Sequence, residues 1–309
     1  MNTEHGDQAV HSGISDQVSS QRLNSNSVVQ LNRIGQSLLA SGVPIKDSDQ
    51  IVEDYDFLQI IGQGAFGTVF KASCKRSNRQ VAIKYMKSCH QADREAEMLC
   101  KIPKHPNIIQ LIEIYRSTDA TFLVQEYCSQ SLPEITSKLT PRDVTSLIFQ
   151  LSSVLESLHS HNIIHRDLKP ENIMVVRDGE KWQAKVIDFG LATELANINT
   201  HCRPAGTDLF MAPEMIRGTY DSKADMWSLG ITCCLLMSGE LPVSASVESR
   251  KLYEQILRLD CQRLKFKPVF EKKFCDLIRS LLDQDPGARP TACALRTQLA
   301  TCNKQQFHD

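Results

Sequence analysis

Residues 165–190 read HRDLKPENIMVVRDGEKWQAKVIDFG, a stretch with a polar motif at each end. The first motif holds Asp167 and Asn172, and the second is Asp188-Phe189-Gly190. Two carboxylates and a carboxamide offer oxygen ligands, which Mg²⁺ prefers and usually combines with substrate phosphates. The stretch therefore predicts a divalent metal ion held beside a polyphosphate.

A glycine-rich segment lies upstream, where residues 60–70 read IIGQGAFGTVF. This pattern is typical of a strand, a glycine turn and a second strand, in which backbone N–H groups can approach phosphate oxygens closely. A dinucleotide-binding fold also uses G-x-G-x-x-G, but there a helix follows the glycines directly. Here residues 68–70 and 81–85 have strand character, which argues against the dinucleotide fold.

In this order the motifs resemble those of eukaryotic-type Ser/Thr protein kinases, over residues 55–302. The resemblance implies an α+β, bilobal kinase fold with an ATP cleft between the lobes. Residues 55–127 would form a small β-rich N-lobe with one helix, and residues 128–302 a larger, mainly helical C-lobe. Residues 205–214 and the insert 177–181 look most like the calcium/calmodulin-dependent protein kinase group.

The resemblance also assigns catalytic roles, with ATP and Mg²⁺ as cofactors. Asp167 would orient the attacking hydroxyl, and Lys169 would steady the transferring phosphate. Asn172 and Asp188 would be the metal ligands, and Lys84 would contact the α- and β-phosphates. The expected nucleotide-binding residues are Ile61, Gly62, Gln63, Gly64, Ala65, Phe66, Gly67, Val69, Ala82, Lys84, Glu95, Glu126, Cys128 and Met174.

Helical spacing selects the partner of Lys84. Glu95 falls on the apolar stripe of a helix over residues 93–102, whereas the solvent-facing side carries Asp93, Arg94, Glu97 and Lys101. A buried lysine without a counter-ion tends to lose its proton. We therefore expect a Lys84–Glu95 ion pair.

Further polar residues are expected to have structural roles. Thr140 and Asp143 form a capping-box pattern at the start of a helix, and Ser222 is expected to cap another helix that ends at Met237. The resemblance implies a buried Glu214–Arg289 ion pair. It also implies hydrogen bonds from the catalytic-loop backbone to Asp225.

Composition restricts the class of protein. The 309 residues carry a net charge of −1, and eleven cysteines include no CxxC pair. We expect reduced thiols in a cytoplasmic or nuclear protein, and a monomer that binds neither nucleic acid nor membrane. The polar N-terminus is unlike a signal peptide, and no apolar run has the length of a membrane span.

The ends of the chain differ from its middle in composition. Residues 1–54 have many Ser, Asn and Gln and a net charge of −4, from 3 basic and 7 acidic side chains. We expect a disordered tail over residues 1–54, within which residues 27–39 have the spacing of a short amphipathic helix. Residues 303–309 are expected to form a short C-terminal tail.

The expected partners are ATP and protein substrates with Ser or Thr acceptors. Glu171 and Glu254 occupy places where basophilic relatives carry acids, which favours Arg or Lys N-terminal to the acceptor. Thr200 is the first candidate site for phosphorylation of the activation segment, and Thr193 is the second. Two alternatives are a kinase-like binding scaffold without catalysis and a small-molecule kinase. The four residues Lys84, Asp167, Asn172 and Asp188 disfavour the first, and the peptide-binding segment 206–214 disfavours the second.

Overall fold

The computed structural model describes residues 42–64, 67–87, 90–197, 206–244 and 248–306, of which His90 and residues 302–306 only by their helical backbone. The chain divides into two compact units. The first comprises the chain up to Lys101 together with Gln110–Tyr127, and the second comprises Ile102–Ile109 and the chain from Cys128 onward. No described helix is both long and apolar enough to span a membrane.

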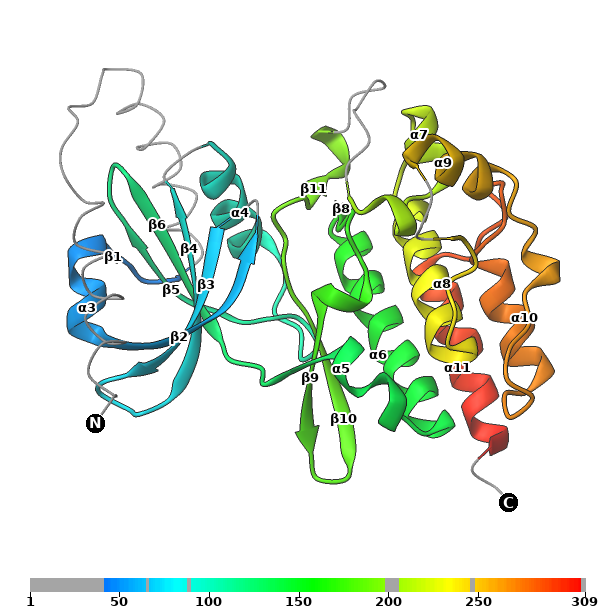
Figure 1. The fold of residues 1–309 in the computed structure, drawn as a ribbon, viewed down its shortest axis with the longest axis horizontal. Coiled ribbons are helices and arrows are strands. Elements are labelled where there is room, and N and C mark those ends of the chain that lie inside the picture. The colour runs from blue at the N-terminus through cyan, green and yellow to red at the C-terminus, as the bar shows by residue number, and fades with distance from the viewer. Residues whose placement is uncertain (1–41, 65–66, 88–89, 198–205, 245–247, 307–309) are drawn as a thin grey trace. The chain divides into compact units, whose positions relative to one another are not determined.

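The first unit is built on a six-stranded sheet with the order β1-β5-β6-β4-β3-β2 (Figure 1). β1 runs parallel to β5, and the other neighbouring strands are antiparallel. The strands are β1 Ile45–Asp47, β2 Tyr55–Gly64, β3 Gly67–Cys74, β4 Gln80–Lys87, β5 Leu111–Arg116 and β6 Ala120–Glu126. Among its described residues, the helices are α3 Ile51–Asp54 and α4 His90–Lys101.

Helix α4 follows the apolar spacing of its sequence. Ala92, Glu95, Ala96, Met98 and Leu99 are buried, and Pro103 follows shortly after the helix ends. Asp93 departs from the prediction. It does not lie on the solvent-facing side, because its carboxylate pairs with Arg116 and its side chain is only 14% exposed.

The predicted tail boundary at residue 54 is wrong, because the described residues 45–54 belong to the first unit. β1 pairs in register with β5, and Ile51 is buried in a core cluster with Tyr55 and Tyr115. Polar contacts add to this packing: Lys46 Nζ bonds Asp54 at 2.9 Å and the Tyr115 hydroxyl at 3.0 Å. Residues 1–41 of the predicted tail, which include the amphipathic segment 27–39, lie outside the described residues.

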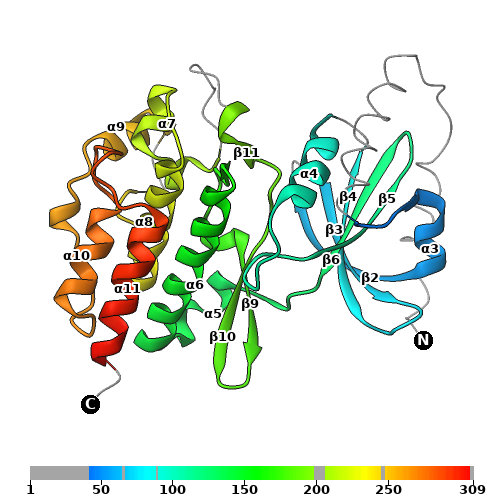
Figure 2. The same cartoon turned by 180° about the vertical axis from the view of Figure 1, so that it is seen from behind.

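The second unit is mainly helical, and α6, α8 and α11 run side by side in it (Figure 2). Its helices are α5 Leu132–Ile135, α6 Pro141–Ser160, α7 Pro213–Arg217, α8 Lys223–Ser238, α9 Ser249–Leu257, α10 Lys272–Ser280 and α11 Ala292–Gln306. Its short strands are β7 Gln130–Ser131, β8 Ile163–Ile164, β9 Ile173–Asp178, β10 Lys181–Val186 and β11 Thr193–Glu194. They form two small sheets, β10-β9-β7 and β11-β8.

Of the two predicted helix caps, the cap of α6 is present and the Ser222 cap of α8 is not. The capping box of α6 is confirmed, because Thr140 Oγ1 accepts from Asp143 N at 3.2 Å and Asp143 Oδ2 accepts from Thr140 N at 2.9 Å. The Ser222 side chain does not cap α8. Instead Asp221 Oδ1 accepts a hydrogen bond from Lys223 N at 2.7 Å.

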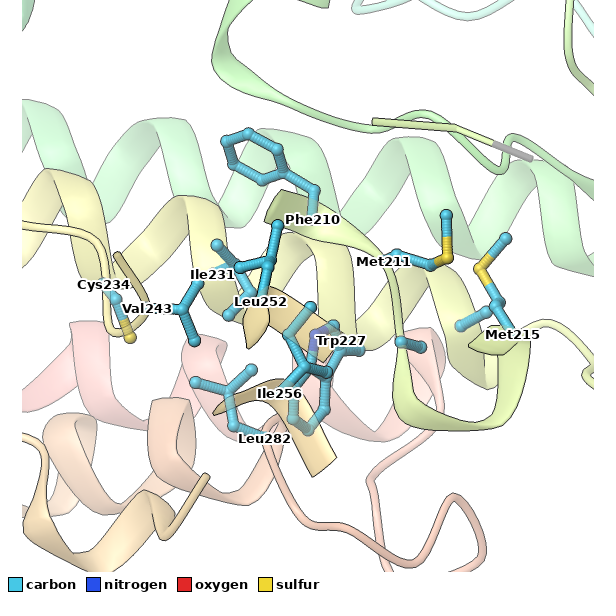
Figure 3. Close-up of a cluster of buried hydrophobic side chains, with 12 residues drawn as sticks. Phe210, Met211, Met215, Trp227, Ile231, Cys234, Val243, Leu252, Ile256 and Leu282 are labelled. Carbon is cyan, nitrogen blue, oxygen red and sulfur yellow. The ribbon is translucent and has the colours of Figure 1, made fainter. Parts of the chain in front are cut away.

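Helix α8 is the core of the second unit, and it is buried around nearly its whole circumference. Figure 3 shows its Trp227 within a cluster to which Ile256, Leu252 and Leu282 contribute from neighbouring elements. At Gly230 an added Cβ would lie 2.8 Å from a Leu282 side-chain carbon, so only glycine permits this close approach.

The contacts of Asp54 predict a pH-dependent stability. Hydrogen bonds from Tyr115 and then from Lys46 hold the pKa of the Asp54 carboxyl below its usual value. A carboxyl with a lowered folded-state pKa stabilises the fold above its unfolded pKa of about 3.9, and this contribution disappears as the pH falls through the folded value. We expect Asp54→Asn to cost about 1–2 kcal/mol of unfolding free energy at pH 7 and progressively less below about pH 4.

Urea unfolding of wild type and variant across this pH range measures the difference. Asp56→Asn is the matched control, because the Asp56 side chain is 61% exposed and its partner Lys75 lies 3.4 Å away. An Asp54→Asn difference that stays constant from pH 7 to pH 3 would contradict the prediction.

Candidate functional site

The predicted Lys84–Glu95 ion pair is confirmed within the first unit. Lys84 Nζ lies 2.6 Å from Glu95 Oε1 and 2.9 Å from Oε2. Both residues are buried, and only 1% of Glu95 is exposed. A buried charge is tolerated when it is paired and hydrogen-bonded, so this carboxylate keeps the ammonium cationic and fixes its position.

The glycine turn of the first unit joins β2 and β3, whose last pair is Gly64 with Gly67. Gly67 has φ +136°, and an added Cβ would lie 2.1 Å from the Tyr85 carbonyl oxygen, so no other residue fits. At Gly64 an added Cβ would meet no atom within 4 Å, which leaves the backbone accessible on that side. Ala65 and Phe66, at the tip, lie outside the described residues.

The other predicted nucleotide-binding residues have varied surroundings. Ile61 is 41% exposed, and Val69 and Ala82 are half-buried on adjacent strands. Glu126 Oε1 accepts from Gln110 N at 2.8 Å. In the second unit Cys128 is buried and Met174 is half-buried on β9.

Asp167 is at the centre of a polar cluster in the second unit. Its Oδ2 accepts from Asn172 Nδ2 at 3.0 Å and lies 2.8 Å from Lys169 Nζ. Asn172 Nδ2 also donates to the Asp167 carbonyl at 2.9 Å. Lys169 and Asn172, predicted from the same short motif as Asp167, therefore both contact Asp167 directly.

Thr207 completes this cluster, although the sequence-based prediction gave it no role. Its N–H and its hydroxyl each donate to Asp167 Oδ1 at 2.8 Å, and Lys169 Nζ contacts its Oγ1. The neighbouring Gly206 has φ +108°, and an added Cβ would lie 2.4 Å from the Arg166 carbonyl. Gly206 lets the backbone come close to Arg166, and a glycine directly before Thr207 was the feature of the sequence that could have pointed to this contact.

The predicted contacts of Asp225 are confirmed. Its carboxylate accepts from the backbone N–H groups of His165 and Arg166, each at 2.9 Å, and lies 2.9 Å from His159 Nε2. Burial acts to raise the pKa of Asp225, but the hydrogen bonds and the two histidines outweigh it, so the pKa lies below its usual value. The anionic carboxylate thus holds the backbone immediately before Asp167.

Arg166 and Asp188 both have a strained backbone, with φ of +67° and +59°. Such conformations in non-glycine residues persist when surrounding contacts fix them, and they cluster at functional sites. Arg166 Nε donates to the Leu191 carbonyl at 2.6 Å, and its NH1 donates to the Tyr220 hydroxyl at 2.9 Å. Asp188 Oδ1 accepts from Gly190 N at 3.3 Å.

Asn172 and Asp188 fit a magnesium ion by the chemistry of their donor atoms. Ile187 N donates to the Asn172 carbonyl at 2.9 Å, so the residue before Asp188 is bonded to Asn172. Because Asn172 Nδ2 is used by Asp167, its Oδ1 is the atom left to bind a cation. A carboxylate and an amide oxygen are hard oxygen ligands suited to Mg²⁺ beside phosphates.

The buried ion pair expected between Glu214 and Arg289 is also present. Arg289 NH1 and NH2 donate to the two carboxylate oxygens of Glu214 at 2.6 and 2.9 Å. The guanidinium also lies 4.9 Å from the ring centroid of Trp227. The pair joins the start of α7 to the chain before α11. Thr200, the predicted phosphorylation site, lies outside the described residues.

Loss of this pair is predicted to destabilise the fold strongly. Arg289→Met leaves the Glu214 carboxylate buried without its partner, and we expect a loss of about 3–5 kcal/mol in unfolding free energy. Urea unfolding measures it. Arg263→Met is the matched control, since the Arg263 side chain is 87% exposed and pairs with Asp260 at 3.2 Å. A loss below about 1 kcal/mol, as expected for the exposed pair, would contradict the prediction.

Comparison with known proteins agrees with this geometry. The chain is 33% identical to the serine/threonine-protein kinase TIO of Arabidopsis thaliana, over 79% of this chain and 19% of that protein. It is 33% identical to sperm motility kinase 3A of Mus musculus, over 82% and 51%. It is 32% identical to calcium-dependent protein kinase 4 of Plasmodium berghei, over 84% and 52%. The chain thus spans about half or less of the length of these relatives.

The protein kinase domain family matches residues 55–299. This range contains the glycine turn, the Lys84–Glu95 pair and the Asp167 cluster, and its two units have the expected β-rich and helical compositions. The chain belongs to the protein kinase domain family.

Proposed function

We propose that this chain transfers the γ-phosphoryl group of Mg-ATP to Ser and Thr residues of proteins. The observation that carries the proposal is the Asp167 cluster, in which Lys169, Asn172 and Thr207 contact one carboxylate. Relatives named as serine/threonine-protein kinases support the choice of acceptor. Phosphoryl transfer needs positioned groups and charge neutralisation rather than covalent catalysis, and this cluster supplies both.

Each residue of the cluster has a distinct task in this proposal. Asp167 orients the acceptor hydroxyl and takes up its proton at a carboxylate oxygen. Lys169 contributes positive charge beside that oxygen, and Thr207 holds the other oxygen through two hydrogen bonds. Asn172 and Asp188 would hold Mg²⁺, which neutralises phosphate charge when bound. Lys84, fixed by Glu95, would contact the α- and β-phosphates.

A binding scaffold without catalysis is the alternative. A scaffold needs neither the four polar residues nor their mutual contacts, yet Lys84 and Asn172 are both buried and bonded to predicted site residues. Keeping buried charges and amides in such contacts has a desolvation cost that a scaffold would not require. The arrangement therefore favours an enzyme.

The preference for basic substrates rests on Glu171 rather than on Glu254. Glu171 is exposed just after the Asp167–Lys169 segment. Glu254 lies 3.8 Å from Arg250 and lines a pocket of about 890 Å³ that Lys251, Arg258 and Arg263 also line. Because Arg250 lies beside Glu254 and three further cations line the same pocket, a substrate arginine gains little there. Monomeric state and a cytoplasmic or nuclear location stay predictions.

A degenerate peptide library with purified chain and Mg-ATP tests the activity. We expect phosphorylated Ser and Thr, with Arg or Lys enriched N-terminal to the acceptor, and loss of signal with a chelator of divalent cations. Asp167→Asn is expected to reduce kcat by about 10²- to 10⁴-fold, because the acceptor proton loses its base. Equal activity of both proteins would contradict the role of Asp167, and a wild type without transfer would favour the scaffold.

Thr207→Val is expected to reduce kcat about tenfold. The variant removes the hydroxyl bond to Asp167 and the contact with Lys169 but keeps the backbone bond, a change of about one charge-assisted hydrogen bond. Steady-state kinetics with a peptide acceptor measures it. Thr207→Ser keeps the hydroxyl and is the matched control, expected near wild-type kcat. A valine variant with unchanged kcat would show that the hydroxyl has no part in catalysis.

A further inference from the structure

Helix α4 of the first unit is attached to the sheet by two of its carboxylates. Asp93 pairs with Arg116 on β5, and Glu95 pairs with Lys84 on β4. Residues two apart on an α-helix point about 200° from each other around its axis, so these carboxylates lie on opposite flanks of α4. A helix attached on both flanks of its buried apolar stripe resists rotation about its axis more strongly than a helix attached on one flank.

The strand register places both basic residues on the same face of the sheet. Lys84 lies opposite Leu123 on β6, and Leu123 lies opposite Ile114 on β5, so these three side chains share a face. Arg116 is two residues beyond Ile114 and therefore points to that face as well. β6 separates the two basic strands, which puts the two attachments about 10 Å apart across the sheet.

The surroundings of Arg116 indicate that it serves this pairing. Its side chain is only 12% exposed, and within the described part of the chain its buried Nε has no hydrogen-bond partner. A buried donor left unpaired costs free energy. The stability of the sheet alone therefore does not explain an arginine here, whereas a requirement to hold Asp93 does.

The segment before β2 supports the strand that carries Arg116. β1 pairs with β5 so that Asp47 lies opposite Arg116, and Ile114 N donates to the Pro44 carbonyl at 2.9 Å. On the opposite face, Tyr115 is bonded to Lys46 and Asp54. β5 is therefore an interior strand of this sheet, and the backbone of Arg116 is held from both sides.

We propose that Arg116 is a positioning residue that acts through Asp93 to hold α4 in the rotation at which Glu95 meets Lys84. The proposal rests on the proposed function, in which Lys84 contacts the nucleotide phosphates. Neither Arg116 nor Asp93 touches the reacting groups. Their effect on catalysis passes through the helix to the Lys84 ammonium.

Chemical labelling of Lys84 in the full nucleotide-free chain tests the positioning without any activity. Only the neutral amine can attack an acylating reagent, forming the amide as the reagent's leaving group departs, and a buried lysine without its counter-charge loses its proton more readily. We expect Arg116→Met to raise the Lys84 labelling rate about tenfold relative to exposed Lys87, as measured by mass spectrometry. Glu95→Gln should give the same increase. The double variant should add nothing further, because both changes remove the same Lys84–Glu95 ion pair.

Three variants control the experiment. Arg116→Lys keeps the charge and is expected to restore labelling close to the wild-type rate. Arg76→Met removes another arginine–aspartate pair of the same unit, with an 81% exposed arginine side chain, and is expected to change nothing. Asp93→Asn gives a second way to break the pair if Arg116→Met does not fold, and circular dichroism checks folding. Wild-type Lys84 labelling in a folded Arg116→Met or Asp93→Asn protein would overturn the proposal.

Kinetics separates this proposal from the proposed function. We expect Arg116→Met to raise the KM for ATP and lower kcat, with the KM for the peptide unchanged. An equal rise in both KM values would indicate general structural damage and count against positioning. If the wild-type chain transfers no phosphate, the proposed function fails while the labelling still decides the positioning. Increased labelling with unchanged kinetics would contradict the role of Lys84 in the reaction.

Discussion

The buried carboxylate of Asp225 is the constraint on which the second unit's site depends. It accepts hydrogen bonds from the backbone N–H groups of two consecutive residues, His165 and Arg166. These bonds fix the positive φ of Arg166, a conformation that an arginine would otherwise avoid. Asp167 follows directly, and its direction is set by this backbone. Since α8 carries Asp225 and is buried nearly all round, the packing around α8 also holds the backbone that leads into Asp167.

Polar contacts that lie close in sequence could be predicted well. The capping box of Thr140 and Asp143 involves neighbours three residues apart, and its geometry follows from helix periodicity. The Lys84–Glu95 pair followed from an apolar stripe that includes one acid. Glu214 and Arg289 are 75 residues apart, and their pairing followed only from the family resemblance. The catalytic roles assigned to Lys84, Asp167, Asn172 and Asp188 remain predictions.

Contacts that depend on tertiary packing were missed for physical reasons. Asp93 looked solvent-exposed because periodicity within a helix cannot show that β5 supplies an arginine beside it. Residues 45–54 looked like part of a polar tail because their ladder partner is some seventy residues away in β5. Thr207 was overlooked because its importance lies in reaching Asp167, forty residues earlier, after a glycine that permits the approach.

The anchoring of residues 102–109 has a topological consequence. Asn107 Nδ2 donates to Gln150 Oε1 and to the Ala184 carbonyl, and Val186 N donates to the Asn107 carbonyl, which fixes this short segment to α6 and β10. The chain therefore leaves the first unit after Lys101, re-enters it at Gln110 and leaves it again after Tyr127. Three covalent crossings join the two units. A single backbone cleavage cannot release either one, and no contiguous fragment contains the complete first unit without part of the second.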